Sequence, residues 1–305
     1  MRRGFTMIEM IIVIVIISIV ASIGLGFVFD LMSEQARREV RNDYEIKARV
    51  VIDHVAARLS ASLLESTVVL KNTNPQSGDC KPLVSLLYDG SEGNILGWIG
   101  IDEEGRYGLW NGSYYAPGWS GLVDLNASFH DGEKTIIVSP GSNFESADQI
   151  IAALTEGSDF NKSALYYVGS SSWINACDDF DWNTTTAGAG KLRPIIRYTD
   201  PRTLEVKGTQ SIRENYLISR SGYALMLQEG NLTLFYNFRP WLGEKPQDGK
   251  SSVLAEDVES FAFRYEGGVV RINVCVGGGR RAGELWSGLF ADENLTVCKE
   301  RAIVR

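Results

Sequence analysis

The chain has 305 residues, 44% of them apolar and 22% charged, which is enough apolar sequence to bury a substantial core. Its formal net charge is −8, and the acidic excess lies in the later part of the chain. A surface of that sign repels phosphates, so the composition argues against a direct nucleic-acid partner. Catalysis is not predicted either, because the only histidines are His54, which lies in a helical pattern, and His130, and no nucleotide-binding motif is present.

The N-terminal part of the chain contains one long uncharged segment, residues 10–29. At the helical rise of about 1.5 Å per residue it spans about 30 Å, the hydrocarbon thickness of a bilayer. It therefore predicts a transmembrane helix. The alternative is a secretory signal cleaved near Val20-Ala21-Ser22, but an ordinary signal has a shorter apolar core and a clearer small-residue cleavage site.

The helical pattern continues beyond the predicted span. Residues 31–64 contain neither Pro nor Gly, and apolar residues recur at spacings of four and seven, as at Tyr44, Val51, Val55 and Leu59. Charged residues occupy the other faces. The pattern predicts a half-buried helix, up to the end of this range, whose apolar stripe lies on a sheet.

From Ser66 onward, short apolar runs alternate with turns rich in Gly and Asn, which predicts a β-rich globular part. The links at 228–231 and 266–268 are typical of hairpins, so we expect antiparallel pairing. One short helix is expected at about 147–154. The expected strands are 84–88, 98–101, 135–138, 164–168, 195–198, 216–219, 224–228, 232–238, 258–265 and 269–276.

The residues that precede the predicted span form a specific motif. Arg2-Arg3-Gly4-Phe5-Thr6-Met7-Ile8-Glu9 combines a short basic leader, a glycine and Phe-Thr-x-x-Glu at the start of an apolar helix. It resembles the prepilin-type signal of type IV pilins and type II secretion pseudopilins. The resemblance implies that a prepilin peptidase cuts between Gly4 and Phe5 and then methylates the new amine of Phe5. A glycine suits this cleavage because no side chain crowds the scissile bond.

Glu9 carries a functional expectation of its own. A carboxylate near the start of a bilayer span costs about 2–3 kcal/mol when it lies deep, so such residues usually have a function. After cleavage it would lie one helical turn from the new amine of Phe5. The resemblance places this pairing between neighbouring subunits, so that Glu9 of an incoming subunit meets the N-terminus of the one before it. The alternative is a side chain that snorkels to the headgroups.

The resemblance also implies an organisation for the whole chain. It implies an α+β, pilin-like fold in which a long N-terminal helix packs on an antiparallel β-sheet with inserted loops and strands. The leader would be residues 1–4, the helix 5–64 and the globular head 65–305, with an insertion at about 89–160. Residues 253–265 additionally resemble the late strands of large minor pilins such as pseudopilin J.

A minor pilin or pseudopilin is a structural filament subunit rather than an enzyme, and a large head suits a place in initiation or at the tip. The implied partners are the prepilin peptidase, other pilins through the N-terminal helix, the inner-membrane assembly platform and the lipid bilayer, with no cofactor. Before assembly the chain would lie in the inner membrane with a periplasmic head, and afterwards in a filament. The rival interpretation is a single-pass membrane-anchored periplasmic enzyme or binding protein that keeps residues 1–4.

Four cysteines, Cys80, Cys177, Cys275 and Cys298, lie beyond the predicted span, and none forms a CxxC pair. In an oxidising periplasm they predict two disulfides, each stabilising the fold by about 2–4 kcal/mol. Three connectivities are open. We favour Cys275–Cys298, which ties the C-terminal tail to a strand, together with Cys80–Cys177. Buried free thiols are the alternative.

Asn-x-Ser/Thr sequons occur at six positions, and in five of them the residue two places earlier is acidic. The five acidic-flanked acceptors are Asn126, Asn161, Asn183, Asn231 and Asn294. This pattern resembles the extended acceptor of bacterial N-linked glycosylation systems. The alternative is that turns favour Asp and Asn together with Ser or Thr. Asn111, preceded at the same offset by Leu109, is an internal control.

Three acidic residues beside Cys177, namely Asp178, Asp179 and Asp181, are a weak candidate for binding Ca²⁺, because oxygen-rich loops bind this cation. They match no fixed ligand spacing. A solvated loop is therefore the favoured interpretation, and no metal site is predicted.

Overall fold

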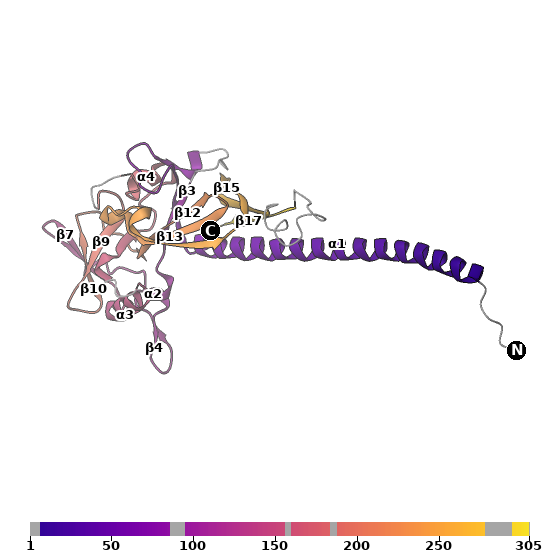
Figure 1. Cartoon of the computed structure of the whole chain (residues 1–305). Helices are drawn as coiled ribbons and strands as arrows, with labels where there is room; N and C mark the ends of the chain where they lie inside the picture. Colours follow the sequence, from indigo (N-terminus) through magenta and orange to yellow (C-terminus); the bar gives the residue numbers. More distant parts are fainter. Residues whose placement is uncertain (1–6, 86–94, 156–159, 184–187, 278–294, 305) are drawn as a thin grey trace.

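The structure, a computed structural model, describes residues 7–85, 95–155, 160–183, 188–277 and 295–304. A β-rich head lies at one end, and half of a long helix projects from it (Figure 1). This helix, α1, runs from Met7 to Ser60 and is followed by antiparallel β-sheets. The expected α+β architecture with a long N-terminal helix is thereby confirmed.

Helix α1 ends at Ser60, earlier than the expected end at about Leu64. The hydroxyl of Ser62 donates a hydrogen bond to the carbonyl of Leu59 at 2.6 Å, which occupies one of the carbonyls that the last helical turn leaves without a partner. The chain then enters strand β1, Ser62–Leu70, in which successive leucines lie in different hydrophobic cores. Burial on both sides, rather than local helix propensity, therefore sets the conformation after Ser60.

The central sheet is formed by strands in the order β14-β13-β12-β3-β1-β2, all paired antiparallel. It is buried on both faces. In β3, Ile95 and Ile99 lie in one core, whereas Leu96 and Trp98 lie in the other, because alternate side chains of a strand point to opposite faces. Besides β1, its strands are β2 (Cys80–Pro82), β3 (Ile95–Gly100), β12 (Ser221–Gln228), β13 (Asn231–Phe238) and β14 (Lys250–Ala255).

Residues 101–220 leave the central sheet after β3 and return to it at β12, the strand paired with β3. We call this segment the excursion. Its outer sheet, in the order β11-β8-β9-β10-β7-β6, shares a core with the central-sheet face that lies opposite α1. The outer strands are β6 (Phe129–Asp131), β7 (Lys134–Val138), β8 (Ala164–Tyr167), β9 (Arg193–Arg197), β10 (Thr203–Lys207) and β11 (Tyr216–Ser219).

The insertion expected at about 89–160 stays a prediction, and its bounds differ from those of the excursion. The expected insertion includes β3, which is an interior strand of the central sheet, and it ends before the outer strands β8, β9, β10 and β11 in the sequence. Apolar periodicity predicts that a strand exists but does not reveal which sheet the strand joins. The excursion begins and ends where the chain crosses between the two sheets.

The two crossing points are fastened to each other by Asp102. Its backbone N–H donates to the carbonyl of Ile218 at 2.8 Å, and its carboxylate lies 3.6 Å from Nε of Arg220. Nε1 of the buried Trp119 donates to the same carboxylate at 3.2 Å. Asp102 is fully buried, and this burial raises its pKa to about 6 despite the neighbouring guanidinium.

The C-terminal sheet, in the order β15-β16-β17, packs on the head-bound half of α1. Its strands are β15 (Val258–Glu266), β16 (Val269–Gly277) and β17 (Thr296–Ile303). The buried stripe of α1, which shares one core with this sheet and the central sheet, consists of Tyr44, Ala48, Val51, Ile52, Val55, Ala56 and Leu59. Two ion pairs join β17 to α1, Lys299–Glu45 at 2.7 Å and Arg301–Asp53 at 3.0 Å. Exposed pairs contribute at most about 1 kcal/mol each, so the apolar stripe dominates this contact.

Short elements complete the head. The expected strand at 84–88 begins within a 3₁₀ helix, and its remainder lies outside the described residues. The expected helix at about 147–154 is present and starts earlier, because the side chain of Asn143 accepts hydrogen bonds from the N–H groups of its first turn. These elements are α2 (Glu103–Tyr107), α3 (Phe144–Leu154), α4 (Ala176–Asp179), η1 (Leu83–Ser85), η2 (Phe160–Lys162), η3 (Trp173–Asn175), η4 (Pro240–Leu242), η5 (Pro246–Asp248), β4 (Leu109–Trp110) and β5 (Tyr115–Ala116).

Two valines on α1 test whether the stripe stabilises the head. Val55 is 0% exposed and Val50 is 60% exposed, so the same substitution probes both sides of one helix. We expect Val55→Ala to lower the free energy of unfolding by about 2 kcal/mol, because it leaves a cavity in the shared core. Val50→Ala is expected to change it by less than about 0.5 kcal/mol. Chemical denaturation of the detergent-solubilised chain, followed by tryptophan fluorescence, measures both; equal effects would contradict the stripe's role.

Candidate functional site

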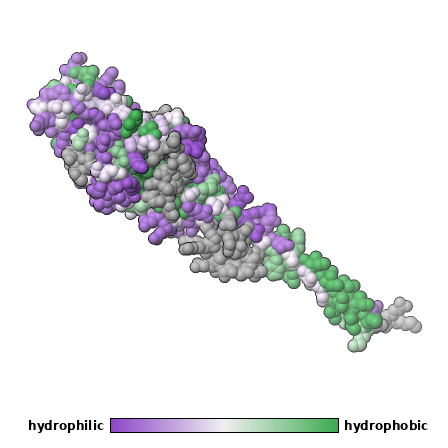
Figure 2. All heavy atoms as spheres, turned by 90° about the horizontal axis from the view of Figure 1, so that it is seen from above, coloured by the Kyte–Doolittle hydropathy of each residue, from purple (hydrophilic) through white to green (hydrophobic). Residues whose placement is uncertain are grey.

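The projecting half of α1 is an unusual surface. Every large apolar side chain from Met7 to Met32 is exposed, and Figure 2 shows them as a continuous hydrophobic region beyond a mostly hydrophilic head. This helix is long and apolar enough to cross a membrane, and within the described part of the chain no residue of its most apolar window is buried. Water does not stabilise such a surface, so it requires lipid tails or another apolar surface.

Glu9 is the only charged residue between Met7 and Phe29, and it lies in the first turn of α1. A carboxylate there is favoured by the positive end of the helix dipole. This first turn is at the end of the helix that lies farthest from the head (Figure 1). Gly4 and Phe5, the expected cleavage and methylation residues, lie outside the described residues.

A charged segment separates the apolar half of α1 from the buried stripe. Residues 34–43 carry acidic and basic side chains that are exposed, with an ion pair between Arg38 and Glu34 one turn apart. The first buried residue of the helix is Tyr44. One continuous helix therefore presents, in order, a lipid-compatible surface, a polar collar and a surface that packs in the head.

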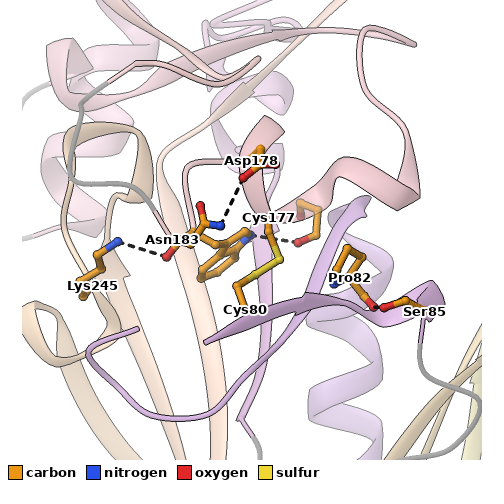
Figure 3. The surroundings of a disulfide bond; sticks show 9 residues. Cys80, Pro82, Ser85, Cys177, Asp178, Asn183 and Lys245 are labelled. Atoms are coloured by element: carbon orange, nitrogen blue, oxygen red, sulfur yellow. Dashed lines mark hydrogen bonds between the residues drawn. A yellow bond between two sulfur atoms is a disulfide. The ribbon is translucent and has the colours of Figure 1, made fainter. Parts of the chain in front are cut away.

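The structure forms two disulfides, Cys80–Cys177 and Cys275–Cys298, the pairing that the sequence analysis favoured. Cys80 on β2 is bonded to Cys177 on α4, which links the edge of the central sheet to the excursion (Figure 3). Cys275 and Cys298 are directly opposite in β16 and β17, so their bond holds the last strand to its neighbour. Such bonds persist outside reducing compartments.

Beside the first disulfide lies a buried polar group centred on Asp181. Its Oδ1 accepts a hydrogen bond from the N–H of Gly190 at 2.8 Å, whereas its Oδ2 has no partner among the described residues. Burial raises the pKa of Asp181 to about 7, although Arg193 and Lys245 lie near enough to oppose the shift. Nζ of Lys245 donates to the carbonyl of Trp182 at 3.1 Å (Figure 3).

The geometry does not support the weak Ca²⁺ candidate. Asp178 accepts a hydrogen bond from the amide of Asn183 at 3.2 Å, and Asp179 accepts one from the hydroxyl of Ser171 at 2.8 Å. With Asp181 turned toward Gly190, the three carboxylates have separate partners and do not converge on one point. Within the described part of the chain, no group of three or more His, Cys, Asp or Glu side chains is placed to hold a metal ion.

Two of the acidic-flanked sequons lie in exposed turns. At Asn126, the carboxylate of Asp124 accepts hydrogen bonds from the N–H groups of Asn126 and Ala127, at 2.9 and 3.1 Å. Asn231 follows a hairpin turn in which Glu229 and Gly230 both have positive φ, as the tightest β-hairpins require. The hydrogen bonds of the first of these turns therefore explain why an acidic residue, Asp124, precedes Asn126.

Two other acidic-flanked acceptors form side-chain hydrogen bonds within the fold, and the last lies outside the described residues. The side-chain oxygen of Asn161 accepts a hydrogen bond from the N–H of Arg197 at 2.8 Å, and the amide of Asn183 is half-buried beside Asp178. Asn294 lies outside the described residues. Asn111, the control, is exposed at the tip of the β4–β5 hairpin.

The β4–β5 hairpin carries a second exposed apolar surface, which the sequence analysis does not predict. Tyr107, Trp110, Tyr114 and Tyr115 are all exposed on or beside it. A detectable signal was present, because residues 107–123 contain aromatic, Gly, Ser and Asn residues but no charged residue.

Comparison with known families bears on the N-terminus alone. Residues 1–25 match the family model described as the prokaryotic N-terminal methylation motif. The chain carries the type IV pilin signal. No curated protein and no solved structure matches the chain. The specific resemblance of residues 253–265 to pseudopilin J is not confirmed.

The pilin signal, together with the exposed apolar helix, fits a protein anchored once in a membrane with its head outside. It supports a subunit of the type IV pilin or pseudopilin type, a structural role rather than an enzymatic one. It also implies, in general terms, interaction with a prepilin peptidase and with other pilins.

The pKa of Asp181 generates a prediction about stability. Because the pKa is about 7 in the folded chain and near 4 in the unfolded chain, the folded state binds more protons between these values. Stability contributed by this group therefore falls as pH rises from about 4 to 7. We expect Asp181→Asn to flatten that fall, since the amide does not ionise, can still accept from Gly190 and tolerates the positive φ of this position.

Denaturation midpoints measured at intervals from pH 4 to pH 7 test this expectation. Asp178→Asn, at an exposed neighbouring position, is the matched control and should follow the parent chain. A parallel pH profile for Asp181→Asn and the parent chain would show that Asp181 does not ionise on this scale.

Proposed function

We propose that the chain is a minor subunit of a type IV pilus or of a type II secretion pseudopilus. The observation that carries the proposal is the pilin signal leading directly into an exposed apolar half-helix that continues, without interruption, into the core of the head. Before assembly, α1 holds the chain in the inner membrane with the head in the periplasm. During assembly, the same apolar surface exchanges lipid for the helices of other pilins.

Processing creates the contact that selects each incoming subunit. The prepilin peptidase cuts between Gly4 and Phe5 and methylates the amine of Phe5. Glu9 then supplies a carboxylate in an apolar environment, where an opposite charge interacts far more strongly than in water. A subunit in the growing filament offers its N-terminal amine to Glu9 of the next subunit on the assembly platform.

A minor position, in initiation or at the tip, is supported by the size of the excursion. A repeating filament requires every copy of the head to fit beside its neighbours. Residues 101–220 add a whole outer sheet to one face of the central sheet, and the β4–β5 hairpin projects from it (Figure 1). Such a large head fits most easily at the end of the filament, where it has fewer neighbours.

Glu9→Val is the decisive variant because it keeps the helix apolar and removes only the carboxylate. We expect membrane insertion and cleavage after Gly4 to remain normal, while incorporation into sheared filaments falls about tenfold or more. Glu39→Val, which changes the same residue type in the exposed collar of α1, is the matched control and should assemble normally.

Intact-protein mass spectrometry supplies the second readout of this experiment. The mature parent and both variants should begin at N-methylated Phe5. A mature chain that still carries Met1, or that starts near Ser22, would favour the rival membrane-anchored periplasmic protein. Correct processing with equal incorporation of Glu9→Val would instead leave the pilin assignment intact. It would either refute the pairing role or place this subunit first at the tip, where no earlier neighbour faces Glu9.

We also propose that Asn126 and Asn231 carry N-linked glycans. Of the acidic-flanked acceptors that the structure describes, Asn126 and Asn231 are exposed. Asn161 is exposed too, but its side-chain oxygen accepts a hydrogen bond from the N–H of Arg197, and Asn183 is half-buried with its amide donating to Asp178. Transferases need an accessible backbone that can bend around the acceptor amide. Glycopeptide mapping of protein from the native host should find sugar at these two sites and none at Asn111. Unglycosylated peptides at both sites would contradict the proposal and leave turn composition as the explanation of the sequon pattern.

A further inference from the structure

The β4–β5 hairpin displays four aromatic side chains that the fold leaves in solvent. Tyr107, Trp110, Tyr114 and Tyr115 are 72, 57, 63 and 66% exposed. Trp110 and Tyr115 lie directly opposite each other in the hairpin, with ring centroids 5.3 Å apart and planes inclined at 60°. Large aromatic rings are usually buried, so a group of them in solvent marks a binding surface.

The hairpin is held rigidly, although its rings are exposed. The side-chain oxygen of Asn111 accepts hydrogen bonds from the N–H groups of Ser113 and Tyr114, each at 3.0 Å. At the base, the N–H of Gly118 donates to the carbonyl of Gly105 at 2.9 Å. Rigid aromatic side chains lose little conformational entropy when a ligand binds.

A buried tryptophan anchors this base to the junction of the excursion. Trp119 is fully buried, and its Nε1 donates to both the carbonyl and the carboxylate of Asp102, at 3.0 and 3.2 Å. The guanidinium of Arg106 lies 5.6 Å from the centre of the Trp119 ring. The nearest cation in the sequence is exposed beside Tyr107, and it stacks on the anchor.

The chemistry of the surface selects an uncharged ligand. Residues 107–123 contain no Asp, Glu, Lys, Arg or His, in a chain of which 22% is charged. Phosphate-bearing ligands and charged peptides find no opposite charge there. The polar groups on offer are the hydroxyls of three tyrosines and of Ser113 and the amide of Asn111, which pair with hydroxyl groups. The aromatic faces, in turn, suit the apolar C–H faces of a sugar ring.

The position of the hairpin argues against lipid as the occupant. It projects from the head, well away from the apolar half of α1 that would lie in the bilayer (Figure 1). A bilayer that contained α1 would leave the hairpin in the aqueous space. The ligand must therefore reach it through water, as a polar and neutral molecule does.

We propose that the β4–β5 hairpin binds a neutral oligosaccharide, with Trp110 and Tyr115 as the stacking residues and Asn111 and Ser113 as hydrogen-bonding residues. Two rings inclined to each other contact adjoining sugar units rather than a single one. This role is independent of filament assembly, since it uses no residue of α1.

The test uses the full chain in lauryldimethylamine oxide, a detergent without a sugar headgroup. The fluorescently labelled chain is applied to an array of neutral glucose, mannose, galactose and N-acetylglucosamine oligomers together with sulfated and sialylated glycans. We expect the chain to bind at least one neutral oligomer. We do not expect it to bind the sulfated or sialylated glycans through their charge. Calorimetry with the best hexasaccharide then gives the affinity of each variant.

Trp110→Ala should weaken that affinity by about tenfold or more, and Trp110→Phe should restore part of it. Tyr115→Ala should also weaken it, whereas Tyr198→Ala, which removes a tyrosine that is 49% exposed outside the hairpin, should not. Three results would overturn the proposal: no neutral oligomer bound, equal binding by Tyr115→Ala and Tyr198→Ala, or self-association that Trp110→Ala abolishes in the absence of sugar. Each leaves the assembly of Glu9→Val and the proposed function untouched.

Discussion

The rest of the structure depends on the burial of one helical stripe. Between Tyr44 and Leu59, side chains of α1 fill a core that they share with the central and C-terminal sheets. Because the helix is continuous, this contact sets the direction in which the apolar half leaves the head. The two halves of α1 are therefore stabilised differently: the head buries one, whereas the other requires a membrane or a filament.

The central sheet shows how the head enlarges without disturbing that stripe. Its strands bury side chains on both faces, one against α1 and the C-terminal sheet and the other against the outer sheet. All of the outer sheet lies within the excursion, whose ends meet at Asp102 and Arg220. The two proposed functional surfaces consequently fall on different layers, the assembly surface on α1 and the aromatic hairpin on the excursion.

Local patterns in the sequence predicted what local physics determines. The uncharged span, the amphipathic continuation of the helix and β11, expected and observed at residues 216–219, follow from periodicity alone. The start of β1, up to Leu64, falls within the expected helix, and its remainder is not predicted as a strand, because an apolar run buried on both faces has no period-two pattern. β17 is absent from the strands expected from the sequence, because its charged residues make it look like a polar loop. In the structure, Lys299 and Arg301 pair with carboxylates on α1.

The candidate site divides in the same way. The motif around Gly4 and Glu9 is contiguous in sequence and could be identified from it, whereas the junction at Asp102 joins residues that are distant in the chain.

The bond between Cys80 and Cys177 has a mechanical consequence. If the hairpin held its proposed ligand while α1 was anchored, a pull on the ligand would enter the excursion and leave through α1. Along the backbone alone, that tension would pass through β3 and β12, whose hydrogen bonds would have to resist it. The disulfide from α4 to β2 adds a third, covalent connection at the edge of the same sheet. The excursion is thus tethered at three points, and unravelling of the segment between Cys177 and β12 would not release it from the head.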